Sequence, residues 1–285
     1  MIATKSRPAA GAGPAGHFDL PALSSRPYPA VMGVLNVTPD SFSDGGQFVA
    51  PEHALAQARR LVAEGADIID IGAESTRPYG SEPISADEEL KRLQPVLPEV
   101  VSLGIPVSID SMKSAVVAWA LDAGATVAND VWGLQHDPDM AALLASRNSP
   151  VIIMHNRDRA DASVDIMKDI AEFFIRSLDI AAKAGISAGN ILLDPGIGFG
   201  KTPEQSITAL ARLNELTLFG LPLLVGASRK RFISSVSPSE PHQRLGGSIA
   251  AHLMAAKGGA RIIRTHDVPE TVQALRVAAA IEDRR

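Results

Sequence analysis

The stretch Ile191-Leu-Leu-Asp-Pro-Gly-Ile-Gly-Phe-Gly-Lys201 joins a short apolar run to a turn that is rich in glycine. The apolar run stops at Asp194, and the turn ends at Lys201. The same arrangement recurs along the chain: an apolar run stops at a polar residue, a loop of Gly, Pro, Ser or Asp follows, and an alanine-rich helical stretch begins. Continuous apolar runs are typical of parallel strands that are covered on both faces.

The apolar runs divide the rest of the chain from Ala30 onward. They are residues 31–35, 68–71, 107–109, 126–128, 151–154, 191–193, 223–225 and 262–263. Helices are predicted over residues 51–64, 85–102, 113–123, 137–145, 164–184, 203–214, 243–257 and 269–281. Ser85 with Glu88 has the capping-box spacing, and Gly65 and Gly124 supply left-handed helix ends. Strand and helix in alternation predict an α/β fold, a single-domain (β/α)8 TIM barrel over residues 30–285, with an open doubly wound sheet as the alternative.

Composition sets limits on function. Hydrophobic residues are 46% and charged residues 21% of the 285 residues, which is ordinary for a soluble globular protein. We expect no membrane partner, because there is no apolar run of about 18 residues, the length that spans a bilayer. A net charge of −5 without a basic cluster argues against a nucleic-acid partner. The absence of cysteine excludes disulfides and thiolate zinc sites, and it suits a cytoplasmic location.

The first 29 residues are rich in Ala, Pro, Gly and Ser and lack the apolar core of a secretory signal. We therefore expect residues 1–29 to be a disordered N-terminal extension.

Polar residues that end the runs form the candidate site. They are Asn36, Asp70, Asp110, Asn129, His155, Asp194, Ser228 with Lys230, and Arg264 with His266. A single strand-end Asp or Asn is more often a loop starter than a functional group, and His155 alone favours a structural role. All strands of a barrel point the same way, however, so the set is expected to converge on the carboxyl-end mouth.

The set indicates binding of a polar heterocycle that carries an anion. Carboxylates and carboxamides match the donor and acceptor edges of such a ring, while Arg264 and His266 suit an anionic group. The loop over residues 36–46 suits a lid, and residues 74–78 offer hydroxyl groups and a guanidinium to phosphate oxygens. Free N–H groups after Ser228 suit a carboxylate. A diphosphate substrate would bring Mg²⁺, for which Asn36 is an oxygen donor.

Two other interpretations of the lysines were weighed. The turn before Lys201 has neither the Walker spacing nor the GxGxxG spacing of phosphate-binding loops. Lys230 as a Schiff-base lysine of an aldolase-type barrel is less favoured, because Arg229 is adjacent and the mouth is rich in carboxamides.

The motifs resemble those of the dihydropteroate synthase family of pterin-binding enzymes over nearly all residues from 30 to 281. The matching motifs are Leu35-Asn-Val-Thr-Pro-Asp-Ser-Phe-Ser-Asp-Gly-Gly46, Glu74-Ser-Thr-Arg-Pro78, Ser108-Ile-Asp-Ser111, Asn129-Asp130, Asp194-Pro-Gly-Ile-Gly-Phe-Gly-Lys201, Ser228-Arg-Lys230 and Arg264-Thr-His-Asp267. The resemblance implies a TIM-barrel transferase of folate biosynthesis, the target of sulfonamides. It joins a pterin diphosphate to 4-aminobenzoate with Mg²⁺ and is typically a homodimer.

The resemblance also implies roles for individual residues. Pterin-binding residues are Asp110, Asn129, Met154, Asp194, Lys230 and Arg264. Diphosphate-binding residues are Asn36, Arg77 and His266, with Asn36 also at the metal. Aminobenzoate-binding residues are Phe42, Thr76, Pro78, Phe199 and Ser228. The catalytic residues are Asp44, Lys230 and Arg264, and Asp44 would stabilise a pterin-methyl cation after diphosphate departs. Lys201 is left without a role and is expected at the surface.

Some positions depart from the family pattern, and two other pterin-binding functions are alternatives to the synthase. The departures are Ala73, Tyr79-Gly80 and His155-Asn-Arg157, which bear on loop shape and sulfonamide affinity more than on the reaction. A pterin-dependent methyltransferase would need no diphosphate lid. A pterin-binding pseudo-enzyme would be expected to lose Lys230, Arg264 or the first loop, and all of these are present.

Overall fold

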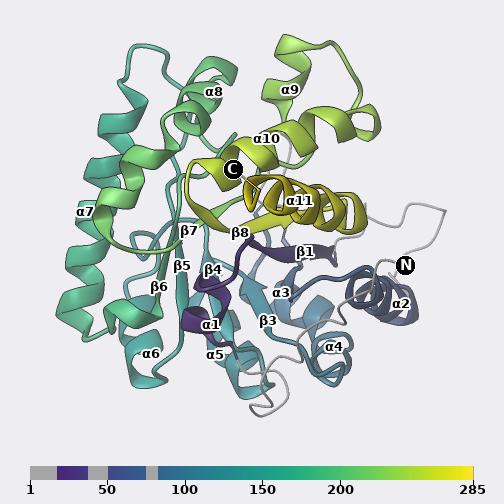
Figure 1. Cartoon of the computed structure of the whole chain (residues 1–285). Coiled ribbons are helices and arrows are strands. Elements are labelled where there is room, and N and C mark those ends of the chain that lie inside the picture. Colours follow the sequence, from purple (N-terminus) through teal and green to yellow (C-terminus); the bar gives the residue numbers. More distant parts are fainter. Residues whose placement is uncertain (1–17, 38–50, 75–82, 285) are drawn as a thin grey trace.

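The computed structural model describes residues 18–37, 51–74 and 83–284, and it confirms the predicted (β/α)8 barrel (Figure 1). Its parallel strands form a closed sheet in their order along the chain, and the last strand pairs with the first. The strands are β1 (Ala30–Asn36), β2 (Ile68–Gly72), β3 (Val107–Asp110), β4 (Val127–Asp130), β5 (Val151–Met154), β6 (Ile191–Asp194), β7 (Leu223–Val225) and β8 (Ala260–Thr265).

Helices surround the strands on the outside of the barrel (Figure 1). The α-helices after β1 are α2 (Pro51–Ala63), α3 (Ala86–Leu93), α4 (Leu97–Val101), α5 (Ser114–Asp122), α6 (Met140–Ser146), α7 (Ile166–Ala184), α8 (Pro203–Ala211), α9 (Arg231–Val236), α10 (Leu245–Lys257) and α11 (Val268–Glu282). Short 3-10 helices are η2 (Ala188–Asn190), η3 (Leu213–Phe219) and η4 (Pro241–Gln243).

The predicted helix ends are confirmed in part. Ser85 caps α3, since its hydroxyl accepts from the backbone N–H of Glu88, but Glu88 bonds to Arg92 instead of completing a capping box. The helix predicted over residues 85–102 is divided into α3 and α4, with Pro95 between them. Proline has no N–H to continue the helical ladder, which accounts for the break. Gly65 and Gly124 are left-handed, as predicted, with φ of 100° and 103°.

Alternation along each strand separates the interior of the barrel from its outer layer. Ile68 packs inside with Val127, Ile152, Leu192 and other residues in one apolar cluster, whereas the next residues along the strands pack outside against the helices. Successive side chains of a strand point to opposite faces. Residues two positions beyond the interior apolar layer therefore point inward again, nearer the carboxyl end.

The amino end of the barrel is covered by a segment that the sequence predicted to be disordered. Helix α1 (Leu20–Ser24) is capped by Asp19, and Phe18 and Leu20 are buried against the interior cluster with Met32 and Ile68. The prediction of disorder is therefore wrong for residues 18–29. Phe18 and Leu20 cover the apolar interior, which would otherwise be exposed to water at this end of the barrel. Residues 1–17 lie outside the described part.

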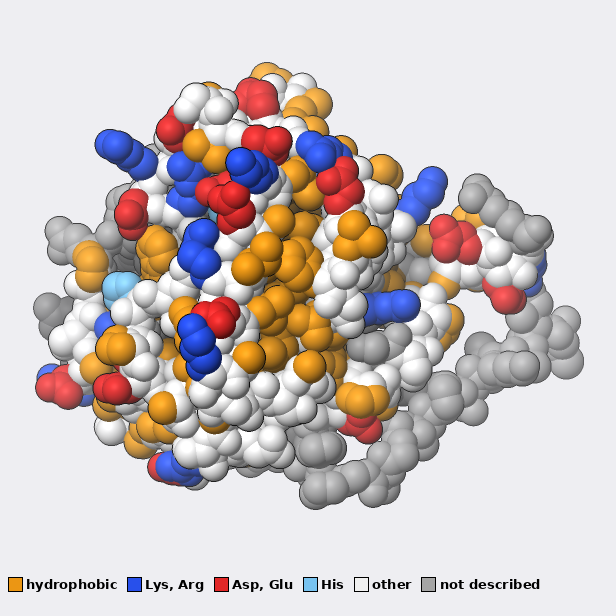
Figure 2. Space-filling model, turned by 90° about the vertical axis from the view of Figure 1, so that its left-hand side faces the viewer, with side chains coloured by type: hydrophobic (Ala, Val, Ile, Leu, Met, Phe, Trp, Pro, Cys, Tyr) orange, Lys and Arg blue, Asp and Glu red, His pale blue; other side chains and the backbone are white. Residues whose placement is uncertain are grey.

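The outer surface mixes apolar and charged side chains. Figure 2 views the face that lies at the left of Figure 1, where α7 is found, and shows hydrophobic side chains gathered at its centre with Lys, Arg, Asp and Glu around them. In the ranges that the structure describes, no helix has the length and apolar character to cross a membrane.

Candidate active site

A polar layer lies above the apolar interior at the carboxyl ends of the strands. Alternation turns inward the side chains two residues beyond Ile68, Ser108, Val127, Ile152, Leu192 and Ile262. The residues so placed are Asp70, Asp110, Asn129, Met154, Asp194 and Arg264. The structure thus brings together the residues that the sequence proposed for a pterin from β3, β4, β5, β6 and β8.

Arg264 is the centre of this layer. Its Nε atom donates to Asp70 Oδ2 at 2.6 Å, and its Nη2 atom donates to Asp110 Oδ2 at 2.9 Å. Asp70 also accepts from Asn129 Nδ2, at 3.2 Å. One guanidinium and one carboxamide therefore link β2, β3, β4 and β8 across the mouth of the barrel.

Two acceptor atoms in this layer have no protein partner. Among the described residues, Asp110 Oδ1 and Asn129 Oδ1 are buried and accept no hydrogen bond. Burial raises the pKa of Asp110, the charge of Asp70 acts in the same direction, and Arg264 opposes both. Buried polar atoms are nearly always paired in native proteins. These two atoms therefore point to a ligand that brings hydrogen-bond donors.

Asp194 ends β6 and begins the glycine-rich turn. Its Oδ1 atom accepts from the backbone N–H of Gly196 at 2.7 Å, and its side chain is buried. Burial raises the pKa of Asp194 to about 6, whereas the Gly196 bond and the charges of Lys230, Lys201 and Arg264 lower it. The turn passes close to other groups: a Cβ at Gly196 would lie 2.0 Å from the carbonyl oxygen of His155.

Lys230 faces the turn from the start of α9. Its Nζ atom lies 4.0 Å from the centre of the Phe199 ring, a cation–π contact, and its stem passes beside Gly198. The preceding residue, Arg229, has a φ of 57° and is held by Asp267, whose carboxylate accepts from Arg229 Nε at 3.1 Å. The backbone N–H of Arg229 also donates to Ser248. This fixed bend supports the position of Lys230 beside Phe199.

Ser228 and His266 form a second polar pair at the mouth. Ser228 Oγ accepts from the backbone N–H of His266 and lies 3.1 Å from His266 Nδ1. Burial lowers the pKa of His266 to about 3, and the charge of Arg264 acts in the same direction. The ring is therefore neutral near pH 7. We assign the Ser228 hydroxyl as donor to Nδ1, which leaves the N–H of Nε2 as the group that His266 offers to an anion.

The structure describes Asn36 but not the residues that the sequence predicted in the first two loops. Asn36 is half-buried at the end of β1, where its backbone pairs with that of Gly72. The others lie in residues 38–50 and 75–82, outside the described ranges: Phe42, Asp44, Thr76, Arg77, Pro78 and Tyr79. Ala73 is buried, and its carbonyl oxygen accepts from Arg92 Nη1 at 3.0 Å.

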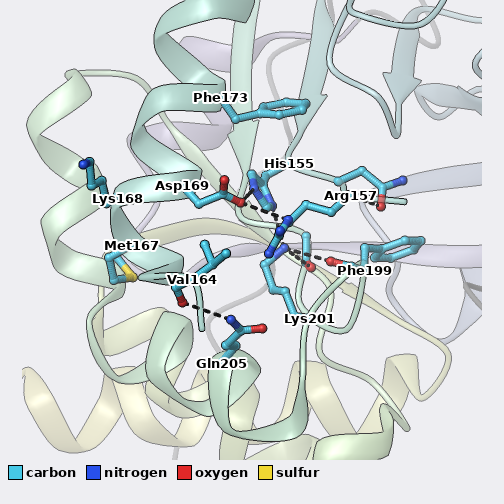
Figure 3. Close-up of polar contacts among 12 residues, drawn as sticks. His155, Arg157, Val164, Met167, Lys168, Asp169, Phe173, Phe199, Lys201 and Gln205 are labelled. Atoms are coloured by element: carbon cyan, nitrogen blue, oxygen red, sulfur yellow. Dashed lines mark hydrogen bonds and ion pairs between the residues drawn. The ribbon is translucent and has the colours of Figure 1, made fainter. Parts of the chain in front are cut away.

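Two expectations from the sequence are wrong. His155 follows Met154 and therefore points away from the mouth, where its ring is fully buried beside Asp169 of α7. Lys201 is not at the surface: its side chain is 6% exposed and bonds to His155 and to the turn that precedes it (Figure 3). A long side chain that folds back on its own loop leaves no signal in sequence spacing.

Asp70 is the member of the site that was given no role. The signal was present, since Asp70 is a carboxylate inside the otherwise apolar run Ile68–Ile71. A charge in a buried strand requires a partner, which here is Arg264.

The chain was compared with known proteins. The family model described as pterin binding enzyme matches residues 32–266. The dihydropteroate synthase of Bacillus subtilis is 41% identical over 93% of each chain. A probable bifunctional folylpolyglutamate synthase/dihydropteroate synthase of Haloferax volcanii is 45% identical, and the match covers 97% of this chain but only 33% of that protein.

Solved structures agree with these relatives. The crystal structure of dihydropteroate synthase from Clostridium difficile in the presence of pteroic acid is 47% identical and has a TM-score of 0.85. The match covers 89% of this chain and 97% of that chain. Identity of this extent over a whole barrel, together with the polar layer at its mouth, shows the family. The chain belongs to the dihydropteroate synthase family of pterin-binding enzymes.

Proposed function

We propose that this protein joins (7,8-dihydropterin-6-yl)methyl diphosphate to 4-aminobenzoate, giving 7,8-dihydropteroate and diphosphate. The observation that carries the proposal is the pair of buried acceptor atoms without a partner, Asp110 Oδ1 and Asn129 Oδ1, in the same layer as Asp194. Acceptors of this kind suit the amino and ring N–H groups of a pterin. The similar enzyme from Clostridium difficile was crystallised with pteroic acid, a compound that joins a pterin to aminobenzoate.

The proposed reaction begins with loss of diphosphate. The bond between the pterin methylene carbon and the diphosphate oxygen breaks, and its electron pair leaves with the diphosphate. The amine nitrogen of 4-aminobenzoate then attacks the methylene cation, forms the C–N bond and loses a proton. We propose that Asp44 stabilises the cation electrostatically, without a covalent enzyme intermediate.

The pterin is proposed to lie in the polar layer. Asp110, Asn129 and Asp194 accept from its amino-pyrimidine edge, Lys230 donates to it, and Met154 contacts the ring. Arg264 is proposed to pack on the face of the ring and to help hold the departing diphosphate. Its ion pair with Asp110 supports this arrangement, because it uses only one oxygen of Asp110 and leaves Oδ1 available to the ligand.

Diphosphate is assigned to Asn36, Arg77, His266 and Arg264. Mg²⁺ is a hard cation that prefers oxygen ligands and often has few protein ligands. The carboxamide oxygen of Asn36 and the phosphate oxygens of the substrate would be ligands of this kind. The described residues contain no group of three or more His, Asp or Glu side chains arranged for a metal. Asn36 is proposed as its protein ligand, because a carboxamide oxygen is a hard donor of the kind that Mg²⁺ prefers. When bound, Mg²⁺ would neutralise charge on the leaving diphosphate.

The aminobenzoate is proposed to lie against Phe199, with its carboxylate near Ser228. The contact between Phe199 and Lys230 supports this position, since it places an aromatic ring next to a residue that is proposed to bind the pterin. Phe42, Thr76 and Pro78 are proposed to complete the seat from the first two loops.

The function is tested by mixing the purified protein with the pterin diphosphate, 4-aminobenzoate and Mg²⁺ and measuring dihydropteroate. Product is expected with the complete mixture and not when 4-aminobenzoate is left out. Intact binding of the pterin without product would contradict the proposed reaction and leave a binding protein.

A homodimer is also proposed. Large apolar side chains are exposed on neighbouring helices: Ile207 on α8, Met254 on α10, which is 56% exposed, and Val277 on α11, which is 54% exposed. α10 contacts both α8 and α11, so these residues belong to one side of the barrel. Exposed apolar surface of this kind suits a subunit interface.

Sedimentation velocity tests the dimer. Met254→Lys with Val277→Lys is expected to shift the protein to monomer, whereas Ile175→Lys on α7 is expected to leave the dimer intact. A monomeric wild-type protein at micromolar concentration would contradict the proposal.

The cytoplasmic location also remains a prediction, made from the cysteine-free sequence.

A further inference from the structure

A buried lysine, Lys201, lies beside the glycine-rich turn, next to His155 and Asp169 of α7 (Figure 3). Lys201 Nζ donates to the carbonyl oxygens of Gly196 at 2.8 Å and Phe199 at 3.1 Å, and it lies 2.6 Å from His155 Nδ1. An ammonium group has three N–H donors and no acceptor. These three partners use all of its donors, and two of them belong to the turn itself.

His155 connects Lys201 to a helix. Its Nε2 atom lies 3.0 Å from Asp169 Oδ2 of α7, and its ring makes a T-shaped contact with Phe173. Burial and the charge of Lys201 lower the pKa of His155 to about 4, although Asp169 opposes them. The ring is neutral near pH 7 and has one N–H, which we assign to Nε2 because Asp169 can only accept. Nδ1 is then the acceptor for Lys201.

The protonation of Lys201 follows from the same geometry. Burial lowers its pKa to about 7, and the charges of Asp194 and Asp169 act in the opposite direction. A neutral amine would have only two N–H donors and would leave one of the three buried acceptors without a partner. The arrangement of acceptors therefore fits the ammonium form.

The turn is also held by Ile197, which is fully buried in the core, and by the close approach of Gly200 to Arg157. Lys201 is the side chain that bonds to its carbonyl groups. The described backbone bonds of the turn run from Gly196 N–H to Asp194 and from Phe199 N–H to the carbonyl of Gly196. Within the turn, Phe199 contacts Lys230. The path Asp169–His155–Lys201 thus connects α7 to the part of the turn that carries the aromatic ring.

We propose that Lys201 is a positioning residue for the aminobenzoate seat: it holds the turn 195–200 by two carbonyl groups and so fixes the Phe199 ring beside Lys230. This inference rests on the proposed function for the identity of the substrate, but the tethering of the turn does not depend on it. Lys201 touches neither substrate in this assignment and acts through Phe199.

Lys201→Met tests the proposal, because methionine has similar length and cannot donate. Loss of the ammonium leaves two turn carbonyls and His155 Nδ1 unpaired. The KM for 4-aminobenzoate is expected to rise roughly tenfold, the change that about 1.4 kcal/mol of lost binding gives. The Kd for 6-hydroxymethylpterin, measured by calorimetry, is expected to stay within about threefold, since the strand-end residues that hold it are unchanged.

The matched control is Lys183→Met. Lys183 is exposed on α7 and bonds to Asp179 at 2.6 Å, so this variant removes the same charge without touching the turn. It is expected to match the wild type in both measurements. A parallel loss of pterin and aminobenzoate binding in Lys201→Met would show general support of the site and would overturn the specific role.

A double-mutant cycle tests whether Lys201 acts through Phe199. If it does, Lys201→Met combined with Phe199→Leu raises the KM for 4-aminobenzoate no further than Phe199→Leu alone. Additive effects would overturn the inference. Should Lys201→Met fail to fold, Asp169→Asn weakens the same path at its far end and is expected to raise the same KM by a smaller factor; an unchanged KM there would also count against it.

Amide hydrogen exchange gives a readout that does not require catalysis. Exchange at Gly196 and Phe199 is expected to accelerate in Lys201→Met and not in Lys183→Met, because their bonds lie within the tethered turn. Equal exchange in both variants would overturn the tether. Absence of synthase activity in the wild type would contradict the proposed function alone, since the exchange comparison would still decide this inference.

Discussion

The guanidinium of Arg264 is bound to Asp70 through Nε, at 2.6 Å, although 194 positions of the chain separate the two residues. Asp70 is fully buried and also accepts from the carboxamide of Asn129. It therefore sets the orientation of two residues that are proposed to bind the pterin, while its own carboxylate lies between them. A pair of this kind depends on both partners, because one charge left alone in a buried site is costly.

Asp70→Asn should weaken pterin binding. The variant keeps the shape of the side chain but removes the charge that holds Arg264, and hydrogen bonds to charged groups contribute about 1.5–3 kcal/mol. The Kd for 6-hydroxymethylpterin, measured by calorimetry, is expected to rise by roughly tenfold to a hundredfold. Asp122→Asn is the control, since Asp122 is exposed and pairs only with Arg147 in the described structure. A lower melting temperature with unchanged Kd would reduce Asp70 to a structural residue.

Asp194 should make both stability and binding depend on pH. Its pKa rises from an ordinary 3.8 to about 6 in the folded protein, mainly through burial. The folded state therefore binds more protons than the unfolded state between these two pH values, and the free energy of unfolding falls as pH rises through the window. Above pH 6 the full cost of the buried charge is present.

Asp194→Asn removes this cost. At pH 8 the variant is expected to be more stable than the wild type by about 3 kcal/mol, and near pH 4 the two should be nearly equal in stability. Urea unfolding at both pH values measures the difference. Pterin affinity of the wild type should fall below about pH 6, where the carboxylate loses its charge. A stability difference that is the same at both pH values would show that the charge of Asp194 is not its cause.

Gly196→Ala should disrupt the turn. Gly196 has a φ of 62°, and an added Cβ would lie 2.0 Å from the carbonyl oxygen of His155, a distance that requires the backbone to move. We expect a loss of more than about 3 kcal/mol in the free energy of unfolding, or insoluble protein. Gly246→Ala is the control. Gly246 lies in α10 with open space around it, so alanine there should stabilise the helix by roughly 0.5–1 kcal/mol.

The sequence predicted the barrel and the inward polar layer because both follow from periodicity. Asp110, Asn129 and Asp194 each end an apolar run, and strands that point the same way bring such residues together. The same argument gave a wrong position for His155. The run before it ends at Met154, which takes the inward position, and alternation turns the next residue, His155, outward. The inward position within each run therefore distinguishes Met154 from His155.

Lys201 and the amino-terminal segment were missed for a different reason. The partners of Lys201 are backbone carbonyls and a histidine from another loop, and no spacing in the sequence records such contacts. Phe18 and Leu20 stand in a stretch whose Ala, Pro and Gly content suggested disorder. Their burial depends on an open apolar layer at the end of the barrel, which exists only once the strands have closed.

Leu20→Ala should lower stability without changing the chemistry. Leu20 is buried against the interior cluster at the amino end of the barrel, opposite the polar layer. Replacing a buried leucine with alanine costs about 2–5 kcal/mol, and the lower part of that range is expected at the edge of a core. Because active sites of barrels lie at the carboxyl end, kcat and both KM values should stay at wild-type levels at temperatures where the variant is folded.

Pro21→Ala, an exposed position on the same helix, is the control and should leave the melting temperature nearly unchanged. Thermal unfolding and steady-state kinetics on the same preparations check both expectations, and a Leu20→Ala protein as stable as the Pro21→Ala protein would show that α1 adds nothing to the barrel.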